Sequence, residues 1–120
     1  SHRILIVDDE PNIVISLEYL MKKEGFQIAV ATDGETALLR ASEFVPDLIL
    51  LDVMMPKKSG FEVCQALRAN PALAGVKIIM LTAKGRETEV AKGLALGADA
   101  YITKPFSTKD LVLQIKSLLA

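Results

Sequence analysis

Three aspartates follow apolar runs, where a charged side chain is costly to keep. Asp52 ends the run LILLD, and Asp8 and Asp9 come directly after RILIV. A carboxylate beside so much apolar sequence loses solvation unless a cation or hydrogen bonds compensate it. Carboxylate oxygens are the ligands that Mg²⁺ prefers, and the set contains no histidine or cysteine. These residue types indicate a Mg²⁺ site, at which Mn²⁺ could substitute.

Two further polar residues occupy similar positions. Thr82 lies near the end of the run VKIIMLTA, and Lys104 follows AYIT. A lysine ammonium suits a phosphoryl oxygen, and a threonine hydroxyl is a neutral donor. Taken singly, each residue has an ordinary explanation. An acidic pair is typical of a solvated turn, a threonine is common in strands, and a lysine is usually a surface charge. Their joint meaning depends on whether the fold brings them together.

Apolar runs alternate with segments of helical periodicity along the whole chain. The runs predict strands at residues 3–7, 27–31, 48–52, 76–83 and 100–103. The helical segments begin near Pro11, after Asp33-Gly34, at Gly60, at Thr88 and after Ser107, which is expected to cap the last helix in an approximate capping box with Asp110.

This alternation predicts an α/β fold of the (βα)5 type. Strands that are apolar at consecutive positions are typical of a parallel sheet covered by helices on both faces. The carboxyl ends of such strands meet at one edge, where ligands bind. Asp8, Asp9, Asp52, Thr82 and Lys104 are therefore expected at the same edge, where crowded carboxylates raise one another's pKa unless a cation lies among them.

Composition excludes several function classes. A net charge of -1 gives no support for binding to nucleic acid or to a membrane by this segment. No apolar run reaches the roughly 20 residues that a membrane-spanning helix needs. The single cysteine, Cys64, falls on the apolar face of its helix and is expected to be buried rather than reactive. One cysteine cannot form an internal disulfide, which favours a reducing, cytoplasmic location.

Four stretches together resemble the receiver domain of two-component response regulators: ILIVDDE, DLILLDVMMPKKSG, IIMLTA and GADAYITKPF. The D-x-x-x-P-x-x-x-G element (Asp52, Pro56, Gly60) and the K-P-F element that begins at Lys104 are specific in combination. The resemblance implies a single domain over residues 1–120. It also implies a flavodoxin-like three-layer sandwich with a five-stranded parallel sheet in the order 2-1-3-4-5.

The resemblance also implies roles for particular residues. Asp52 would accept a phosphoryl group from a phosphohistidine on a sensor histidine kinase or a phosphotransfer protein. Asp9, Asp52 and the backbone carbonyl of Met54 would bind Mg²⁺, and Asp8 would hold it through water. Beyond catalysing its own phosphorylation and dephosphorylation, such a domain is not an enzyme.

A second group of roles concerns switching. Thr82 would hydrogen-bond the phosphoryl group, Lys104 would pair with it, and Tyr101 would turn inward when Thr82 and the loop after it move. The Lys104-Pro105 bond would be cis. The surface of the fourth helix, fifth strand and fifth helix would then control an output domain or another partner, without direct contact between this domain and nucleic acid.

Dimerisation on phosphorylation remains open. Receivers joined to winged-helix DNA-binding domains typically dimerise through charged pairs on the switching surface. Val90, Ala100 and Gln114 stand where those relatives usually carry Arg, Asp and Arg. Loss of these charges removes the pairing that fixes the register of such an interface, and it disfavours the charge-paired dimer.

Other functions on a similar fold fit less well. Phosphatases of the haloacid-dehalogenase type carry a second aspartate two residues after the first, where this chain has Met54. A flavin- or nucleotide-binding module is disfavoured because no glycine-rich phosphate motif follows any strand. The remaining alternative is a phosphorylation-independent interaction module, which the presence of all five key residues disfavours.

Overall fold

The computed structural model describes residues 2–83 and 86–120, over which strands and helices alternate. The strands are β1 (Arg3–Val7), β2 (Gln27–Ala31), β3 (Leu48–Asp52), β4 (Lys77–Ala83) and β5 (Ala100–Lys104). The helices are α1 (Pro11–Lys23), α2 (Gly34–Phe44), α3 (Gly60–Ala69), α4 (Glu87–Ala95) and α5 (Thr108–Leu119). Among these described helices, none has the length and apolar character needed to cross a membrane.

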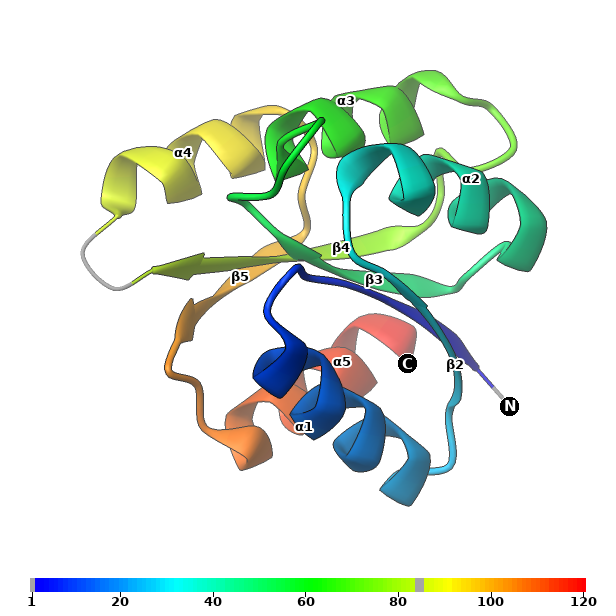
Figure 1. Ribbon diagram of the computed structural model, residues 1–120, viewed down its shortest axis with the longest axis vertical. Coiled ribbons are helices and arrows are strands. Elements are labelled where there is room, and N and C mark those ends of the chain that lie inside the picture. The colour runs from blue at the N-terminus through cyan, green and yellow to red at the C-terminus, as the bar shows by residue number, and fades with distance from the viewer. Residues whose placement is uncertain (1, 84–85) are drawn as a thin grey trace.

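The strands form one parallel sheet in the order β2-β1-β3-β4-β5, as predicted. Helices α1 and α5 cover one face, and α2, α3 and α4 cover the other, which makes three layers (Figure 1). In the register of the sheet, Asp52 pairs with Leu81, and Ala83 pairs with Lys104. The carboxyl ends of β3, β4 and β5 therefore reach the same edge.

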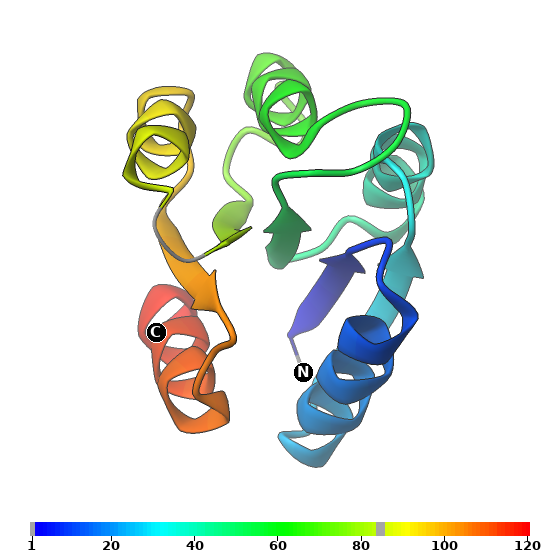
Figure 2. The same ribbon diagram turned by 60° about the vertical axis from the view of Figure 1, so that its left-hand side comes forward.

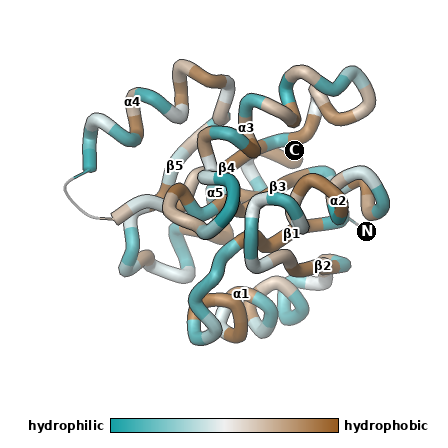
Figure 3. Tube along the Cα trace, turned by 45° about the horizontal axis from the view of Figure 1, so that its top comes forward, coloured by the Kyte–Doolittle hydropathy of each residue, from teal (hydrophilic) through white to brown (hydrophobic). Residues whose placement is uncertain are grey.

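Successive residues of each strand enter two different cores. Leu5 and Ile49 are buried on the side of α2 and α3, whereas Ile6 and Leu50 are buried on the side of α1 and α5. All four are fully buried, which confirms the expected sheet with two covered faces. The helices alternate between hydrophobic and hydrophilic residues along their length, as expected of helices with one face on a core (Figure 3).

Local signals place most of the helix ends. Pro11 occupies the first turn of α1, where its missing N–H costs nothing. At α5, Ser107 caps the helix as expected, with its hydroxyl accepting from the N–H of Asp110 at 3.3 Å. That bond is only the serine half of the predicted capping box. The full reciprocal box instead begins α3, between Ser59 and Glu62, and was not predicted.

The remaining differences lie at element ends. Strand β4 begins at Lys77 rather than at residue 76, and α4 covers residues 87–95 rather than 88–96. Strand β5 continues through Lys104 because this residue still pairs with Ala83, so the proline ends the strand one residue later than expected. The Lys104-Pro105 bond is cis, as predicted. Residues 84 and 85, in the expected switching loop, lie outside the described residues.

Candidate functional site

The three aspartates converge at the carboxyl edge of the sheet. Asp8 is completely buried, Asp52 is 6% exposed, and Asp9 faces solvent. One carboxylate oxygen from each of the three lies within 4.8 Å of the others. Asp8 and Asp9 reach this point because β1 lies beside β3 in the sheet. The predicted convergence of carboxylates from two distant segments is present.

Lys104 supplies the positive charge of the site. Its Nζ lies 2.8 Å from Asp8 Oδ2 and 3.4 Å from Asp52 Oδ1. It also lies 3.3 Å from Oε1 of Glu10, a contact that the sequence analysis did not predict. The only sequence signal for it is that Glu10 directly follows Asp8-Asp9, so three acidic residues in a row leave β1. Lys104 therefore neutralises part of a strongly acidic edge.

The surroundings raise the pKa values of both Asp52 and Lys104. Burial and the nearby charge of Asp8 raise the pKa of Asp52, Lys104 offsets part of this rise, and the pKa of Asp52 is about 7. Burial disfavours the charged form of Lys104, but contacts with Asp8, Asp52 and Glu10 outweigh this, so the pKa of Lys104 is raised. The site thus contains a carboxyl group whose ionisation is costly until more positive charge arrives.

The segment of residues 53–59, between β3 and α3, holds Met54 beside the Asp52 carboxylate. The backbone N–H of Met54 donates toward Asp52, which lowers the pKa of that carboxyl. The N–H of Gly60 donates to the carbonyl of Val53 at 2.9 Å and closes the base of the loop. A Cβ at Gly60 would overlap the carbonyl oxygen of Asp52, which explains the glycine in the D-x-x-x-P-x-x-x-G element.

Thr82 reaches the same edge but lines a separate hollow. It follows Leu81, the register partner of Asp52, and is 2% exposed. Among the described residues its Oγ1 has no hydrogen-bond partner. A hollow of about 150 Å³ separates Thr82 from Tyr101, whose side chain is 44% exposed. A buried hydroxyl with no hydrogen-bond partner among the described residues is energetically costly, so Thr82 could donate to an acceptor that enters the site.

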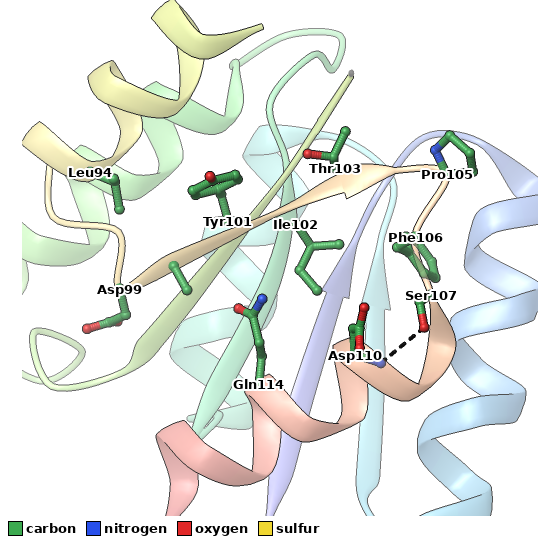
Figure 4. A pocket seen from close by; sticks show the side chains of 11 residues that line it. Leu94, Asp99, Tyr101, Ile102, Thr103, Pro105, Phe106, Ser107, Asp110 and Gln114 are labelled. Atoms are coloured by element: carbon green, nitrogen blue, oxygen red, sulfur yellow. Dashed lines mark hydrogen bonds between the residues drawn. The ribbon is translucent and has the colours of Figure 1, made fainter. Parts of the chain in front are cut away.

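A larger hollow of about 610 Å³ lies between β5 and the start of α5 (Figure 4). Asp110 and Gln114 reach toward it from α5, and Tyr101 lies at its β5 side. Ala100 also lines it. Of the positions where charged pairs were considered, Ala100 and Gln114 therefore border one solvent-accessible depression, and Val90 borders the smaller hollow beside Tyr101.

The model of the response regulator receiver domain matches residues 4–116. The chain belongs to the response regulator receiver family. The fold, the acidic edge and the lysine on β5 are thus those of a signalling domain of two-component systems. Receivers typically bind Mg²⁺ at an acidic pocket, and the cluster of Asp8, Asp9 and Asp52 offers the all-oxygen donor set that could hold such an ion.

Individual relatives agree with this assignment. The chain is 47% identical over 119 residues to the alkaline phosphatase synthesis transcriptional regulatory protein PhoP of Bacillus subtilis, covering 99% of this chain and 49% of that protein. It is 44% identical to the phosphate regulon transcriptional regulatory protein PhoB of Rhizobium meliloti, covering 98% and 52%. The receiver therefore spans about half the length of the curated relatives it matches.

Solved receivers share the fold closely. The chemotaxis response regulator CheY4 of Vibrio cholerae matches with a TM-score of 0.91 and 30% identity, over 98% of both chains. The receiver domain of a histidine kinase from Syntrophus aciditrophicus matches with a TM-score of 0.92 and 34% identity, over 99% of this chain and 90% of that one. These likenesses confirm the flavodoxin-like arrangement expected from the sequence.

Proposed function

We propose that this receiver, acting as one domain over residues 1–120, accepts a phosphoryl group on Asp52 and signals the change to a partner. One observation carries the proposal: a nearly buried carboxylate lies within contact distance of Lys104 and among two further carboxylates at one sheet edge. The donor would be a phosphohistidine of a sensor kinase or of a phosphotransfer protein. The reducing environment of the cytoplasm, inferred from the single thiol, is the proposed setting.

The proposed reaction is a direct displacement at phosphorus. An Asp52 carboxylate oxygen forms the new P–O bond while the P–N bond to the donor imidazole breaks, and the imidazole leaves with that electron pair. Lys104 already contacts Asp52 and can pair with a phosphoryl oxygen as the group arrives. Such transfers depend mainly on positioning and charge stabilisation, which these residues supply.

A Mg²⁺ ion would be held by Asp9, Asp52 and the Met54 carbonyl, with Asp8 contributing through water. The donor set fits the ion because it is made only of oxygens, and because one oxygen from each aspartate lies within 4.8 Å of the others. When bound, the ion would offset negative charge on the phosphoryl oxygens. Lys104, the cation that now compensates Asp8 and Asp52, could then turn toward the phosphoryl group.

Switching is proposed to begin at Thr82. Its hydroxyl, which has no hydrogen-bond partner in the described part of the chain, can donate to the new phosphoryl oxygen, and the movement would open space toward the hollow beside Tyr101. Tyr101 is exposed and borders both this hollow and the larger one along β5 and α5. The surface of α4, β5 and α5 would therefore change when Asp52 is phosphorylated, and it would be read by an output domain or an effector protein.

The composition of this surface bears on dimerisation. Val90, Ala100 and Gln114 carry no charge, so a dimer held by charged pairs at these positions is disfavoured. PhoP and PhoB are named as transcriptional regulators, and control of transcription through an output domain outside this chain is one form the output could take. The receiver itself would make no direct contact with nucleic acid.

The proposed function has a direct test. Purified protein is incubated with acetyl phosphate, with either Mg²⁺ or a chelator, and its intact mass is followed. We expect the addition of one phosphoryl group that depends on Mg²⁺. A folded protein that stays unmodified with Mg²⁺ and with a phosphohistidine donor would contradict phosphorylation and favour the interaction module that works without it.

A separate prediction concerns Thr82→Ala. The variant should still accept phosphate, because Thr82 is neither the nucleophile nor a metal ligand. It should lose the coupling to Tyr101, since no hydroxyl remains to donate to the phosphoryl group. Amide exchange around Tyr101, with and without the phosphoryl mimic beryllofluoride, measures this coupling.

The exposed Thr88 on α4 provides a matched control. Thr88→Ala removes an equivalent hydroxyl and should respond to beryllofluoride as the wild type does. Equal protection changes in the wild type and in Thr82→Ala would remove Thr82 from the mechanism.

A further inference from the structure

The segment of residues 53–59, called here the β3–α3 loop, takes an indirect path from β3 to α3. It extends sideways toward α2 before returning to α3 (Figure 2). Its base is closed by the hydrogen bond from Gly60 to Val53, and its first part places Met54 beside Asp52. The conformation of its outer part must therefore be fixed by other contacts.

The outer part of the loop rests on the first turn of α2. Gly34 begins this helix and is buried. A Cβ built at Gly34 would overlap both the Cβ and the carbonyl oxygen of Lys58, and would lie 2.9 Å from its carbonyl carbon. Because two of the three atoms belong to backbone, a side-chain rotation cannot relieve the overlap. Only glycine permits this close approach.

Lys57 shows that part of the β3–α3 loop adopts an energetically unfavourable backbone conformation. Lys57 has a φ of 69°, in the left-handed region that residues with a side chain adopt at a cost. Its Nζ lies 3.9 Å from Oδ2 of Asp33, the residue that caps α2 by accepting from the N–H of Thr36 at 2.8 Å. The α2 end thus holds this part of the loop through a backbone contact at Gly34 and a charge contact at Asp33.

We propose that Gly34 is a positioning residue for the metal site, because its lack of a side chain lets the β3–α3 loop pack on α2 and so keeps Met54, whose carbonyl would bind the cation, beside Asp52. This inference rests on the proposed function and deepens it. A side chain at Gly34 would displace Lys58 and shift the loop near Met54, because only three residues lie between Met54 and Lys58. From the sequence, Asp33-Gly34 was predicted only to precede the second helical segment, and this contact was not predicted.

The test measures Mg²⁺ affinity of the unphosphorylated protein by titration calorimetry. Gly34→Ala should bind Mg²⁺ about tenfold more weakly, the scale typical of changes to the groups that support metal ligands. Gly75→Ala is the matched control, because a Cβ there meets nothing within 4 Å, and it should bind as the wild type does. With acetyl phosphate, the Gly34→Ala rate should recover to the wild-type value at saturating Mg²⁺, because Gly34 touches no reacting atom.

A second pair of variants probes the same loop without changing α2. Lys57→Val and Lys57→Gly both remove the ammonium, but only valine resists the left-handed conformation at this position. Mg²⁺ should bind more weakly to K57V than to K57G. Because Lys57 is exposed, this comparison remains available if Gly34→Ala does not fold.

The possible outcomes distinguish a failure of the positioning role of Gly34 from a failure of the proposed phosphoryl-acceptor function. A wild type that neither binds Mg²⁺ nor accepts phosphate would overturn the proposed function and the inference with it. A wild type that does both, with G34A equal to G75A and K57V equal to K57G in Mg²⁺ affinity, would overturn the positioning role alone. Weakened Mg²⁺ binding in G34A and in K57V, relative to their controls, is the result that supports it.

Discussion

Asp52→Asn should reduce phosphoryl incorporation from acetyl phosphate or a phosphohistidine donor to the level seen without a donor. The amide lacks the carboxylate oxygen that attacks phosphorus in the proposed reaction. The substitution keeps the size and shape of the side chain, so the fold should be retained. Intact mass and the circular dichroism of the same samples measure the two effects.

Asp47→Asn is the control for this prediction. Asp47 directly precedes β3, at the opposite end of the strand from Asp52, and it is exposed. Its variant should incorporate phosphate at the wild-type rate. If Asp52→Asn gained a phosphoryl group at that rate as well, the acceptor would have to be another residue, and the assignment of Asp52 would be wrong.

The layout of the fold could be predicted because its signals are local and repeated. Each buried strand is a short apolar run, and the helix starts at Pro11 and Ser107 carry their own markers. The ends of elements were predicted less well because pairing with a neighbour decides them. Lys104 belongs to β5 through its register with Ala83, which the letters around it do not reveal.

In the candidate site, too, some features could be predicted from the sequence and others could not. Asp8, Asp9 and Asp52 could be brought together from sequence because the carboxyl ends of parallel strands share an edge. Contacts made by side chains between distant segments have no such rule. Glu10 beside Lys104 is one example, and the close packing of Lys58 against the backbone of Gly34 is another.

A third example lies away from the site. Arg68 on α3 donates to the carbonyl of Gly97 at 2.9 Å and to Asp99 at 2.9 Å, and so ties α3 to the turn before β5. Nothing in the spacing of these residues signals the contact, because it depends on how two helices lie across the sheet. Sequence patterns thus predicted which residues the strand ends bring together. The contacts between distant segments that hold the loops become visible only in the structure.

Without metal, Asp52→Asn should also make the folded protein more stable above pH 4. Burial and Asp8 raise the pKa of Asp52 from 3.8 to about 7, so the unfolded chain loses this proton before the folded one does. Between about pH 4 and pH 7 the folded state binds the extra proton, and stability falls as pH rises. A change of about three pKa units corresponds to roughly 2–4 kcal/mol after allowance for coupling with Lys104. Asparagine avoids this cost, so its melting temperature should exceed that of the wild type by about 5–15 °C at pH 7.

The shape of the pH dependence distinguishes this effect from a general change in packing. The difference between Asp52→Asn and the wild type should be small near pH 4, grow up to about pH 7 and then level off, as measured by thermal unfolding in a chelator. Mg²⁺ should raise the melting temperature of the wild type more than that of the variant, because the cation compensates a charge that only the wild type carries. Asp47→Asn should follow the wild type throughout. A difference that does not vary with pH, or equal stabilisation of both proteins by Mg²⁺, would mean that the buried charge of Asp52 and its repulsion by Asp8 are not what destabilises the metal-free receiver.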